Sequence, residues 1–339
     1  MNPLVTVLMP VYNGKKYLEE AIKSILNQTF RDFEFLIIDD GSTDNSVEIM
    51  GLFNDARIRI ERNKTNLGLI KTLNKGFGLS KGKYIARMDC DDISLPKRLS
   101  VQVNFMEKHP EIGVCGSWIK VIGLRKKFIN KYFQKHEELK ANLLFSTSFA
   151  HPSVIIRKEL IDKYNLEYDE QYKHAEDYEL WSRMVGHTNM ANINKVLFHY
   201  RMHPTSISKK NSSEQVENSN NVRLGLLGKL GLMPSPAEME IHRLFNCPPS
   251  IQAKEFILQL EKWFGKILSA NEKTKIYEQD SLVKVISSRW LNICSANASL
   301  GFWILKKFWQ SPLKKINYGN FGQTIKFFIK CLFKKKKIN

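Results

Sequence analysis

The sequence predicts an α/β fold with a mostly parallel sheet flanked by helices, because short apolar runs alternate with segments of helical periodicity. The apolar runs are residues 4–9, 35–38 and 84–88, and each ends abruptly in turn-forming or acidic residues. Between them, apolar side chains recur at helical spacing in residues 15–28 and 69–77. We also expect a helix from Ser46 and a weak strand at 58–60.

Polar motifs follow these three strands. They are Pro-Val-Tyr-Asn-Gly at 10–14, Asp-Asp-Gly-Ser-Thr-Asp at 39–44 and Asp-Cys-Asp-Asp at 89–92. Open α/β sheets bind ligands outside the carboxyl ends of their strands. The three motifs are therefore expected to gather in one crevice.

The third motif places three carboxylates within four residues. Such groups repel one another and resist desolvation unless a hard divalent cation and a phosphorylated ligand compensate them. An isolated Asp-x-Asp is more often a solvated turn, but the two neighbouring motifs favour a site for Mn²⁺ or Mg²⁺. Cys90 is not expected to be a ligand, because hard cations prefer oxygen and no second Cys or His stands at zinc spacing.

Residues 4 to about 208 resemble the inverting, nucleotide-sugar-dependent glycosyltransferases of family 2, which have the GT-A fold with a Rossmann-like sheet. Six segments carry the resemblance: 9–13, 38–44, 66–68, 86–92, 175–181 and 200–203. The chain looks most like bacterial enzymes that add hexoses or N-acetylhexosamines to lipooligosaccharide and capsule chains. The resemblance implies transfer of such a sugar from a UDP-sugar to a hydroxyl of a growing surface glycan, including lipopolysaccharide.

The resemblance also implies which residues bind the donor. Tyr12 would stack on the uracil face, and Pro10 would shape the backbone beside it. Stacking does not select a base, so Asp40 would accept a hydrogen bond from uracil N3–H, with a helix-cap role as its alternative. Further donor contacts are expected from Asn13, Asn66, Lys71, Asp89 and Arg201, although Asn66 and Lys71 could equally serve a helix start.

The metal is expected to bind beside the diphosphate. By resemblance, Asp91 would be a direct ligand, Asp89 would lie near the ribose and the metal, and His203 would reach the metal or the diphosphate. Asp92 is expected to cap the next turn. A bound cation would neutralise the diphosphate as it departs.

Glu176 and Asp177 open a predicted amphipathic helix. Acidic residues at a helix start often serve only the helix dipole, which is worth about 0.3–1 kcal/mol. The resemblance points instead to Asp177 as the general base that deprotonates the acceptor hydroxyl. Glu176 would orient either the acceptor or Asp177. A single inverting displacement needs no carboxylate nucleophile. His151 and Trp181 would lie near the sugar and acceptor pocket.

We expect three regions along the chain. Residues 1–208 would form the catalytic domain, with nucleotide-sugar binding in 1–120 and the acceptor and catalytic part in 121–208. Residues 209–299 would be a helical extension, and 300–339 a basic aromatic tail.

The tail carries much of the net charge of +18, because no acidic residue follows Asp280 whereas twelve Lys and Arg do. Aromatic and aliphatic residues are interleaved with them in 302–309 and at helical spacing in 321–333. A basic amphipathic helix of this kind is typical of one lying on an anionic membrane surface. No apolar stretch reaches the roughly 20 residues needed to span a bilayer. The alternative is that the helix packs on the catalytic domain.

The five cysteines show no paired spacing, and no signal peptide is evident before the first strand. We therefore expect a cytoplasmic protein, peripheral on the cytoplasmic face of the inner membrane.

Three other classes of protein fit the sequence less well. A sugar-phosphate nucleotidylyltransferase would normally carry a glycine- and arginine-rich loop after its first strand, and residues 10–14 are not such a loop. A Rossmann dehydrogenase would need Gly-x-Gly-x-x-Gly, which is absent. A nucleic-acid-binding or membrane-binding protein without catalysis could explain the charge, but the basic residues lie beside aromatic ones and the motif crevice is acidic. No nucleic-acid partner is predicted.

Overall fold

The computed structural model describes residues 2–203, 212–244, 254–314 and 321–332, and the chain divides into two compact units. Unit 1 comprises residues 1–139 and 147–219, and unit 2 comprises residues 140–146 and 220–339. The predicted domain boundary at residue 208 lies outside the described residues.

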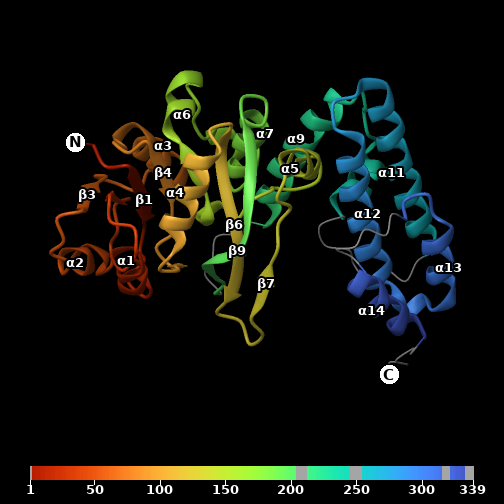
Figure 1. Cartoon of the computed structure of the whole chain (residues 1–339), viewed down its shortest axis with the longest axis horizontal. Helices are drawn as coiled ribbons and strands as arrows, with labels where there is room; N and C mark the ends of the chain where they lie inside the picture. The colour runs from red at the N-terminus through yellow and green to blue at the C-terminus, as the bar shows by residue number, and fades with distance from the viewer. Residues whose placement is uncertain (1, 204–211, 245–253, 315–320, 333–339) are drawn as a thin grey trace. The chain divides into compact units, whose positions relative to one another are not determined.

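Unit 1 is built on a nine-stranded sheet in the order β3-β2-β1-β4-β8-β6-β9-β5, with β7 paired to β6. Figure 1 labels β3, β1, β4, β6, β9 and β7 of this sheet. The strands are β1 (Val5–Val11), β2 (Phe33–Asp39), β3 (Ile58–Arg62), β4 (Tyr84–Arg87), β5 (Ile93–Ser94), β6 (Ile112–Ile122), β7 (Phe128–Asn130), β8 (Ile155–Arg157) and β9 (Asn189–Arg201). Strands β3, β2, β1 and β4 are parallel, as are β6 and β9, and the other pairs are antiparallel.

Helices connect these strands. They are α1 (Leu18–Leu26), α2 (Ser46–Gly51), α3 (Leu69–Leu79), α4 (Arg98–Lys108), α5 (His136–Leu143), α6 (Lys158–Tyr164) and α7 (Glu176–Met184), with short 3₁₀ turns at His151–Ser153 and Glu170–Tyr172. Every residue of β1 is buried, as expected for a parallel strand covered on both faces. The predicted α/β fold of the GT-A type, with its Rossmann-like parallel strands, is confirmed.

The register of the parallel strands brings the three polar motifs together. Val11 at the end of β1 pairs with Asp39 at the end of β2, and Leu8 pairs with Arg87 at the end of β4. The segments that follow these strands therefore leave the sheet at the same edge. On the other side, Ile93 of β5 pairs with His199 of β9, which brings the end of β9 to the acidic turn.

Unit 2 is helical among its described residues. It contains α10 (Pro236–Arg243), α11 (Lys254–Thr274), α12 (Gln279–Ala296), a 3₁₀ turn at Ala298–Leu300, α13 (Phe302–Gln310) and α14 (Phe321–Leu332), together with the ends of α5 and α9 (Ser212–Lys229). Buried His242 forms a hydrogen bond with the Leu144 carbonyl and accepts one from Trp263 Nε1, at 2.8 and 3.0 Å. Burial lowers the pKa of His242 to about 3, so a neutral imidazole organises this core.

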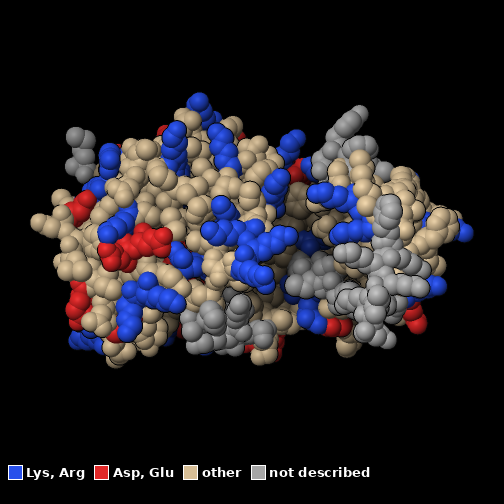
Figure 2. Space-filling view, turned by 90° about the horizontal axis from the view of Figure 1, so that it is seen from below, with Lys and Arg blue, Asp and Glu red and all other residues tan. Residues whose placement is uncertain are grey.

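Lys and Arg side chains are spread widely over the face drawn in Figure 2, whereas Asp and Glu are fewer there. Among the helices of the described residues, none combines the length and apolarity needed to cross a bilayer.

The backbone at Gly82, just before β4, packs closely against the backbone of β1, and this packing can be tested by substitution. The Gly82 N–H donates to Thr6 Oγ1 at 2.9 Å, and an added Cβ would lie 2.4 Å from the Thr6 nitrogen and 2.6 Å from the Val5 carbonyl carbon. Gly82→Ala should therefore lower the free energy of unfolding by about 1–3 kcal/mol, measured by urea denaturation.

Gly78→Ala is the matched control in α3, because nothing lies within 4 Å of its added Cβ. It should be neutral or stabilise by about 0.5–1 kcal/mol. Equal effects of the two substitutions would contradict the tight packing at Gly82.

Candidate active site

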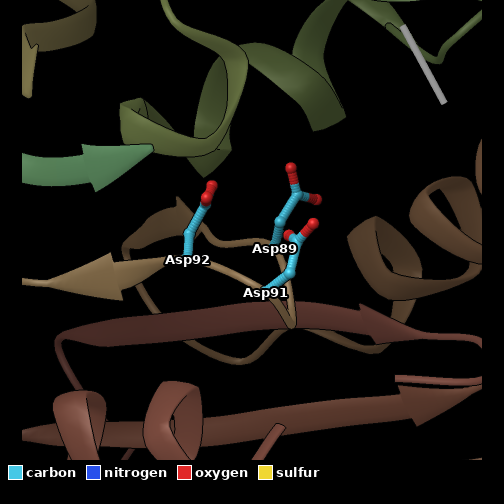
Figure 3. A group of neighbouring side chains, drawn as sticks. All are labelled: Asp89, Asp91 and Asp92. Atoms are coloured by element: carbon cyan, nitrogen blue, oxygen red, sulfur yellow. The ribbon is translucent and has the colours of Figure 1, made fainter. Parts of the chain in front are cut away.

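The acidic turn between β4 and β5 carries Asp89, Asp91 and Asp92. One carboxylate oxygen from each residue lies within 4.8 Å of the others. Figure 3 shows the three side chains projecting to the same side of the turn, with Asp89 next to Asp91. The three carboxylates therefore lie close enough together to hold one metal ion.

Arg87, the last residue of β4, neutralises part of this cluster. Its guanidinium is buried and binds the Asp89 carboxylate through two contacts, Nη1 to Oδ2 at 2.7 Å and Nη2 to Oδ1 at 2.6 Å. Burial raises the pKa of Asp89 to about 6, although Arg87 favours its charged form. Arg87 lies inside the motif at 86–92, but the sequence did not identify its role.

The end of β9 holds the other two carboxylates. His203 Nε2 lies 2.8 Å from Asp91 Oδ2. The backbone N–H of Arg201 donates to Asp92 Oδ1 at 2.7 Å. The side-chain Nε of Arg201 donates to the Asp91 backbone carbonyl at 2.8 Å. Asp92 was expected to cap the next turn, and this is wrong because its side chain binds the β9 backbone. Arg201 anchors the acidic turn, and its contact with a phosphate stays a prediction.

These residues fit a hard divalent cation. The buried Oδ2 atom of Asp92 has no hydrogen-bond partner among the described residues, which is costly unless another group compensates it. Burial raises the pKa of Asp92 well above its ordinary value, and the charges of Asp89 and Asp91 add to the effect. Carboxylate oxygens with one imidazole nitrogen form a donor set suited to Mn²⁺ or Mg²⁺.

The segment after β1 forms the neighbouring wall. Tyr12 is half-exposed, whereas Pro10 is buried within β1. Asn13 has a positive φ of 52°, and its side-chain oxygen accepts a hydrogen bond from the Thr43 N–H at 2.9 Å. The Asn13 N–H donates to Ser42 Oγ at 3.0 Å. These bonds fix the turn after β1 to the turn after β2 and leave the Tyr12 ring available for stacking.

Asp40 holds the loop before α3. Its buried carboxylate accepts hydrogen bonds from Asn63 Nδ2 at 2.8 Å and from the backbone N–H groups of Leu67 and Gly68 at 2.9 Å each. A carboxylate has about four lone-pair positions, so one more donor can be accommodated. Asp40 therefore does not cap α2. Asp44 accepts a hydrogen bond from the Ser46 N–H at 3.0 Å, whereas Asn45, at the N-cap position of α2, makes no side-chain capping hydrogen bond.

Lys71 and Asn66, two of the residues predicted to contact the donor, are exposed to solvent. Lys71 Nζ pairs with the Glu170 carboxylate at 3.3 Å, and both side chains are exposed. Asn66 lies against Gly41, where an added Cβ would come within 2.8 Å of the Asn66 nitrogen. Contact of Lys71 or Asn66 with a donor stays a prediction.

The start of α7 carries the second carboxylate pair. Asp177 accepts a hydrogen bond from Thr147 Oγ1 at 3.2 Å, and burial raises its pKa. Burial also raises the pKa of Glu176 to about 7, with the charge of Asp177 adding to the effect. The positive charge of Arg87 acts in the opposite direction on both groups. The acidic turn and the α7 carboxylates therefore share one electrostatic environment.

His151 and Trp181, the two residues predicted to lie near the sugar and acceptor pocket, contact each other. The His151 Nε2 atom lies 2.7 Å from the Tyr168 hydroxyl, and burial lowers the pKa of His151, so its imidazole is neutral. Trp181 is completely buried and packs edge-on against His151 and Phe149. Trp181 thus supports His151 and presents no surface to a ligand in this structure. Sequence reasoning missed Thr147 and Tyr168, because each is a single polar residue without a surrounding pattern.

Comparison with known proteins shows which family this chain is similar to. A family model described as "Glycosyl transferase family 2" matches residues 6–164. An uncharacterized glycosyltransferase of Haemophilus influenzae is 34% identical over 235 residues, which cover 65% of this chain and 72% of that protein. The O-antigen biosynthesis glycosyltransferase WbnJ of Escherichia coli is 32% identical over 216 residues, covering 61% and 82% of the two chains.

A third relative has a more specific name. WfgD of Escherichia coli, named as a UDP-Glc:alpha-D-GlcNAc-diphosphoundecaprenol beta-1,3-glucosyltransferase, is 27% identical over 213 residues, covering 62% of this chain and 82% of that protein. Among solved structures, S. aureus TarS 1-349 in complex with UDP-GlcNAc gives a TM-score of 0.57 at 19% identity, covering 87% of this chain and 90% of that chain. This likeness supports the fold.

The raised pKa of Glu176 predicts a pH-dependent stability. A carboxyl whose pKa rises from 4.5 to about 7 on folding contributes stability below pH 4.5, and this contribution is lost as the pH rises through 7. Glu176→Gln cannot ionise, so its free energy of unfolding relative to wild type should increase by roughly 3 kcal/mol between pH 4.5 and 8. Chemical denaturation across this range measures the difference. The exposed control Glu48→Gln should stay parallel to wild type, and parallel curves for Glu176→Gln would contradict the shift.

Proposed function

The chain belongs to glycosyl transferase family 2, and from this membership we propose that it transfers a hexose or N-acetylhexosamine from a UDP-sugar to a hydroxyl of a growing surface glycan. One observation carries the proposal. The Arg87 backbone N–H, at the start of the acidic turn, donates to the Val154 carbonyl at 3.0 Å. In the same segment His151 packs against Trp181 of α7, the helix that begins at Glu176 and Asp177. A donor held at the turn would therefore lie close to a candidate base.

The uridine preference rests on two residues at the ends of β1 and β2. The half-exposed ring of Tyr12 offers a stacking surface, which any base can use. Asp40 has an acceptor position beyond its three hydrogen bonds and would accept from uracil N3–H, a donor that cytosine lacks. The name of WfgD, which specifies UDP-Glc, agrees with this choice.

The acidic turn would hold the divalent cation. Asp91, Asp89 and His203 are the proposed ligands for Mn²⁺ or Mg²⁺, and the unpartnered oxygen of Asp92 lies beside them. When bound, the cation would supply charge neutralisation for the departing diphosphate. Arg201 and Arg87 would keep the turn in place through the contacts described above.

Asp177 is the proposed general base. It would take the proton of the acceptor hydroxyl while the hydroxyl oxygen forms a bond to the anomeric carbon. The bond from that carbon to the diphosphate oxygen would break, and its electron pair would leave with UDP. Burial raises the pKa of Asp177 towards neutrality, where a carboxylate is a more effective base. Thr147 orients one carboxylate oxygen, and the single displacement inverts the anomeric configuration.

The acceptor is proposed to be a glycan carried on a lipid. WfgD is named for an acceptor with a diphosphoundecaprenol carrier, and WbnJ for O-antigen biosynthesis. Such an acceptor requires the enzyme to work at a membrane, and we place this chain at the cytoplasmic face of an anionic one. His151, held by Tyr168, would contribute to the sugar and acceptor pocket.

Asp177→Asn tests the base. The substitution keeps the size of the side chain and removes its basicity, so kcat should fall by roughly 10²–10⁴ while UDP affinity is retained. Steady-state kinetics and calorimetry measure the two quantities. Glu176→Gln is the matched control on the adjacent residue and should lower kcat less. Near-normal turnover of Asp177→Asn would remove Asp177 as the base, and a larger loss for Glu176→Gln would transfer the role.

Nucleotide binding tests the donor and the metal together. UDP with Mn²⁺ should raise the melting temperature, because ligand at 100 times its Kd stabilises the native state by about 2.7 kcal/mol. GDP, CMP and NAD should give no comparable shift. Asp91→Asn should remove the metal-dependent part, whereas the exposed control Asp32→Asn should retain it. If no uridine nucleotide binds with metal present, the roles proposed for Tyr12, Asp40 and Asp91 are wrong.

A further inference from the structure

Helices α13 and α14 of unit 2 each have one apolar face buried in the protein. Ile304, Leu305 and Phe308 of α13 are buried, as are Phe327 and Cys331 of α14. The Phe308 and Phe327 rings pack edge to face, with their centroids 5.3 Å apart. One side of each helix therefore packs within unit 2, whereas packing on the catalytic domain, the alternative expected from sequence, stays untested.

A second apolar face of the same two helices is exposed. Its members are large side chains with exposed fractions between 39% and 76%: Phe302 76%, Trp309 39%, Ile325 44%, Ile329 49% and Leu332 66%. Ile325, Phe328, Ile329 and Leu332 follow the spacing that places residues on one side of a helix. Trp309 packs edge-on against Phe328 at 5.5 Å, which joins the exposed side of α13 to that of α14. We refer to these five residues together with partly buried Phe328 as the outer face.

Basic residues border the outer face. Lys306 is exposed on α13, and Lys326 and Lys330 are exposed on α14. Lys314 Nζ lies 4.3 Å from the centroid of the Trp309 ring. The sequence has no acidic residue after Asp280, so nothing in 281–339 offsets this charge.

We propose that the outer face docks on an anionic lipid surface. Its large apolar side chains would enter the boundary between head groups and acyl chains, and the lysines would contact lipid phosphates, as in interfacial amphipathic helices. A tryptophan beside lysines suits that boundary, because its ring is apolar and its N–H is polar. A second copy of this chain is a poorer partner, since self-association through this face would bring lysines against lysines.

The inference deepens the proposed function by naming the surface that would hold the enzyme near a lipid-linked acceptor, but its physical basis is separate. It uses residues of unit 2 alone, whereas the nucleotide site uses residues of unit 1. Binding to vesicles that contain no glycan, in the absence of UDP, tests the outer face without the reaction. Failure of UDP to bind would overturn the donor assignment and leave the vesicle result intact.

The test uses the full chain and sedimentation with phosphatidylcholine vesicles, prepared with and without phosphatidylglycerol. The protein should sediment with the anionic vesicles and stay mostly in solution with the neutral ones, and added salt should weaken the binding. Equal partition onto both kinds of vesicle, or onto neither, would overturn the proposal.

Two variants locate the binding to the outer face. The triple variant Ile325→Ser, Ile329→Ser and Leu332→Ser loses the apolar surface that would be buried in the lipid. Its partition coefficient should therefore fall by at least about tenfold. Its control is Leu52→Ser, which removes a side chain that is 77% exposed in unit 1. The double variant Lys326→Gln and Lys330→Gln should lower anionic binding by roughly 10–30-fold. Lys108→Gln with Lys163→Gln removes the same charge from unit 1 and should have a smaller effect.

Three further measurements decide whether the outer face is the docking surface. A far-ultraviolet circular dichroism spectrum and a cooperative thermal unfolding transition like those of wild type would show that each variant is folded. If the triple and double variants bind anionic vesicles as wild type does, the outer face is not the docking surface. If wild type is a dimer by light scattering and the triple variant a monomer with unchanged vesicle binding, the face is a contact between copies, and the proposal is wrong.

Discussion

The bidentate contact between Arg87 and Asp89 is the interaction on which the candidate site depends. Three carboxylates in one turn would repel one another and lose hydration, and a buried guanidinium offsets part of both costs. The Arg87 main chain is held in place as well, because its carbonyl accepts a hydrogen bond from the buried Arg98 guanidinium at 2.7 Å. Arg87 also ends β4, the last of the four neighbouring parallel strands, and β4 pairs on its other side with antiparallel β8. Its charge therefore acts on the acidic turn and on the α7 carboxylates together.

The parallel strands were predictable from sequence because burial on both faces produces continuous apolar runs, as in β1 and β2. Strand β6 was not predicted, although it is one of the longest, because Gly113 and Gly116 interrupt its apolar pattern. An added Cβ at Gly116 would lie 2.2 Å from Asn192 Oδ1. The small residue is required by a side chain 76 positions away, and this kind of constraint has no local signature in the sequence.

The candidate site was predictable where strand ends determine position, and less so where side chains from distant segments meet. The motifs placed Asp89, Asp91 and His203 in one crevice, and the structure brings them together. The partners that hold them could not be inferred from spacing. Thr147 reaches Asp177 from a segment 30 residues earlier. Likewise, helical spacing predicted the apolar stripe on α14, but only the packing on α13 shows which side stays exposed.

The adjacent carboxylates of α7 have different environments, and this difference bears on their roles. Burial holds the pKa of Glu176 at about 7, so near neutral pH a substantial fraction of it keeps its proton. A protonated Glu176 adds no negative charge beside Asp177, which favours the ionised form of Asp177. Thr147 donates to that carboxylate and stabilises the same form. Two neighbouring acids whose environments separate their protonation states can divide the work of catalysis. On this argument Asp177 is the better candidate for the proposed base, and Glu176 would favour its ionised form.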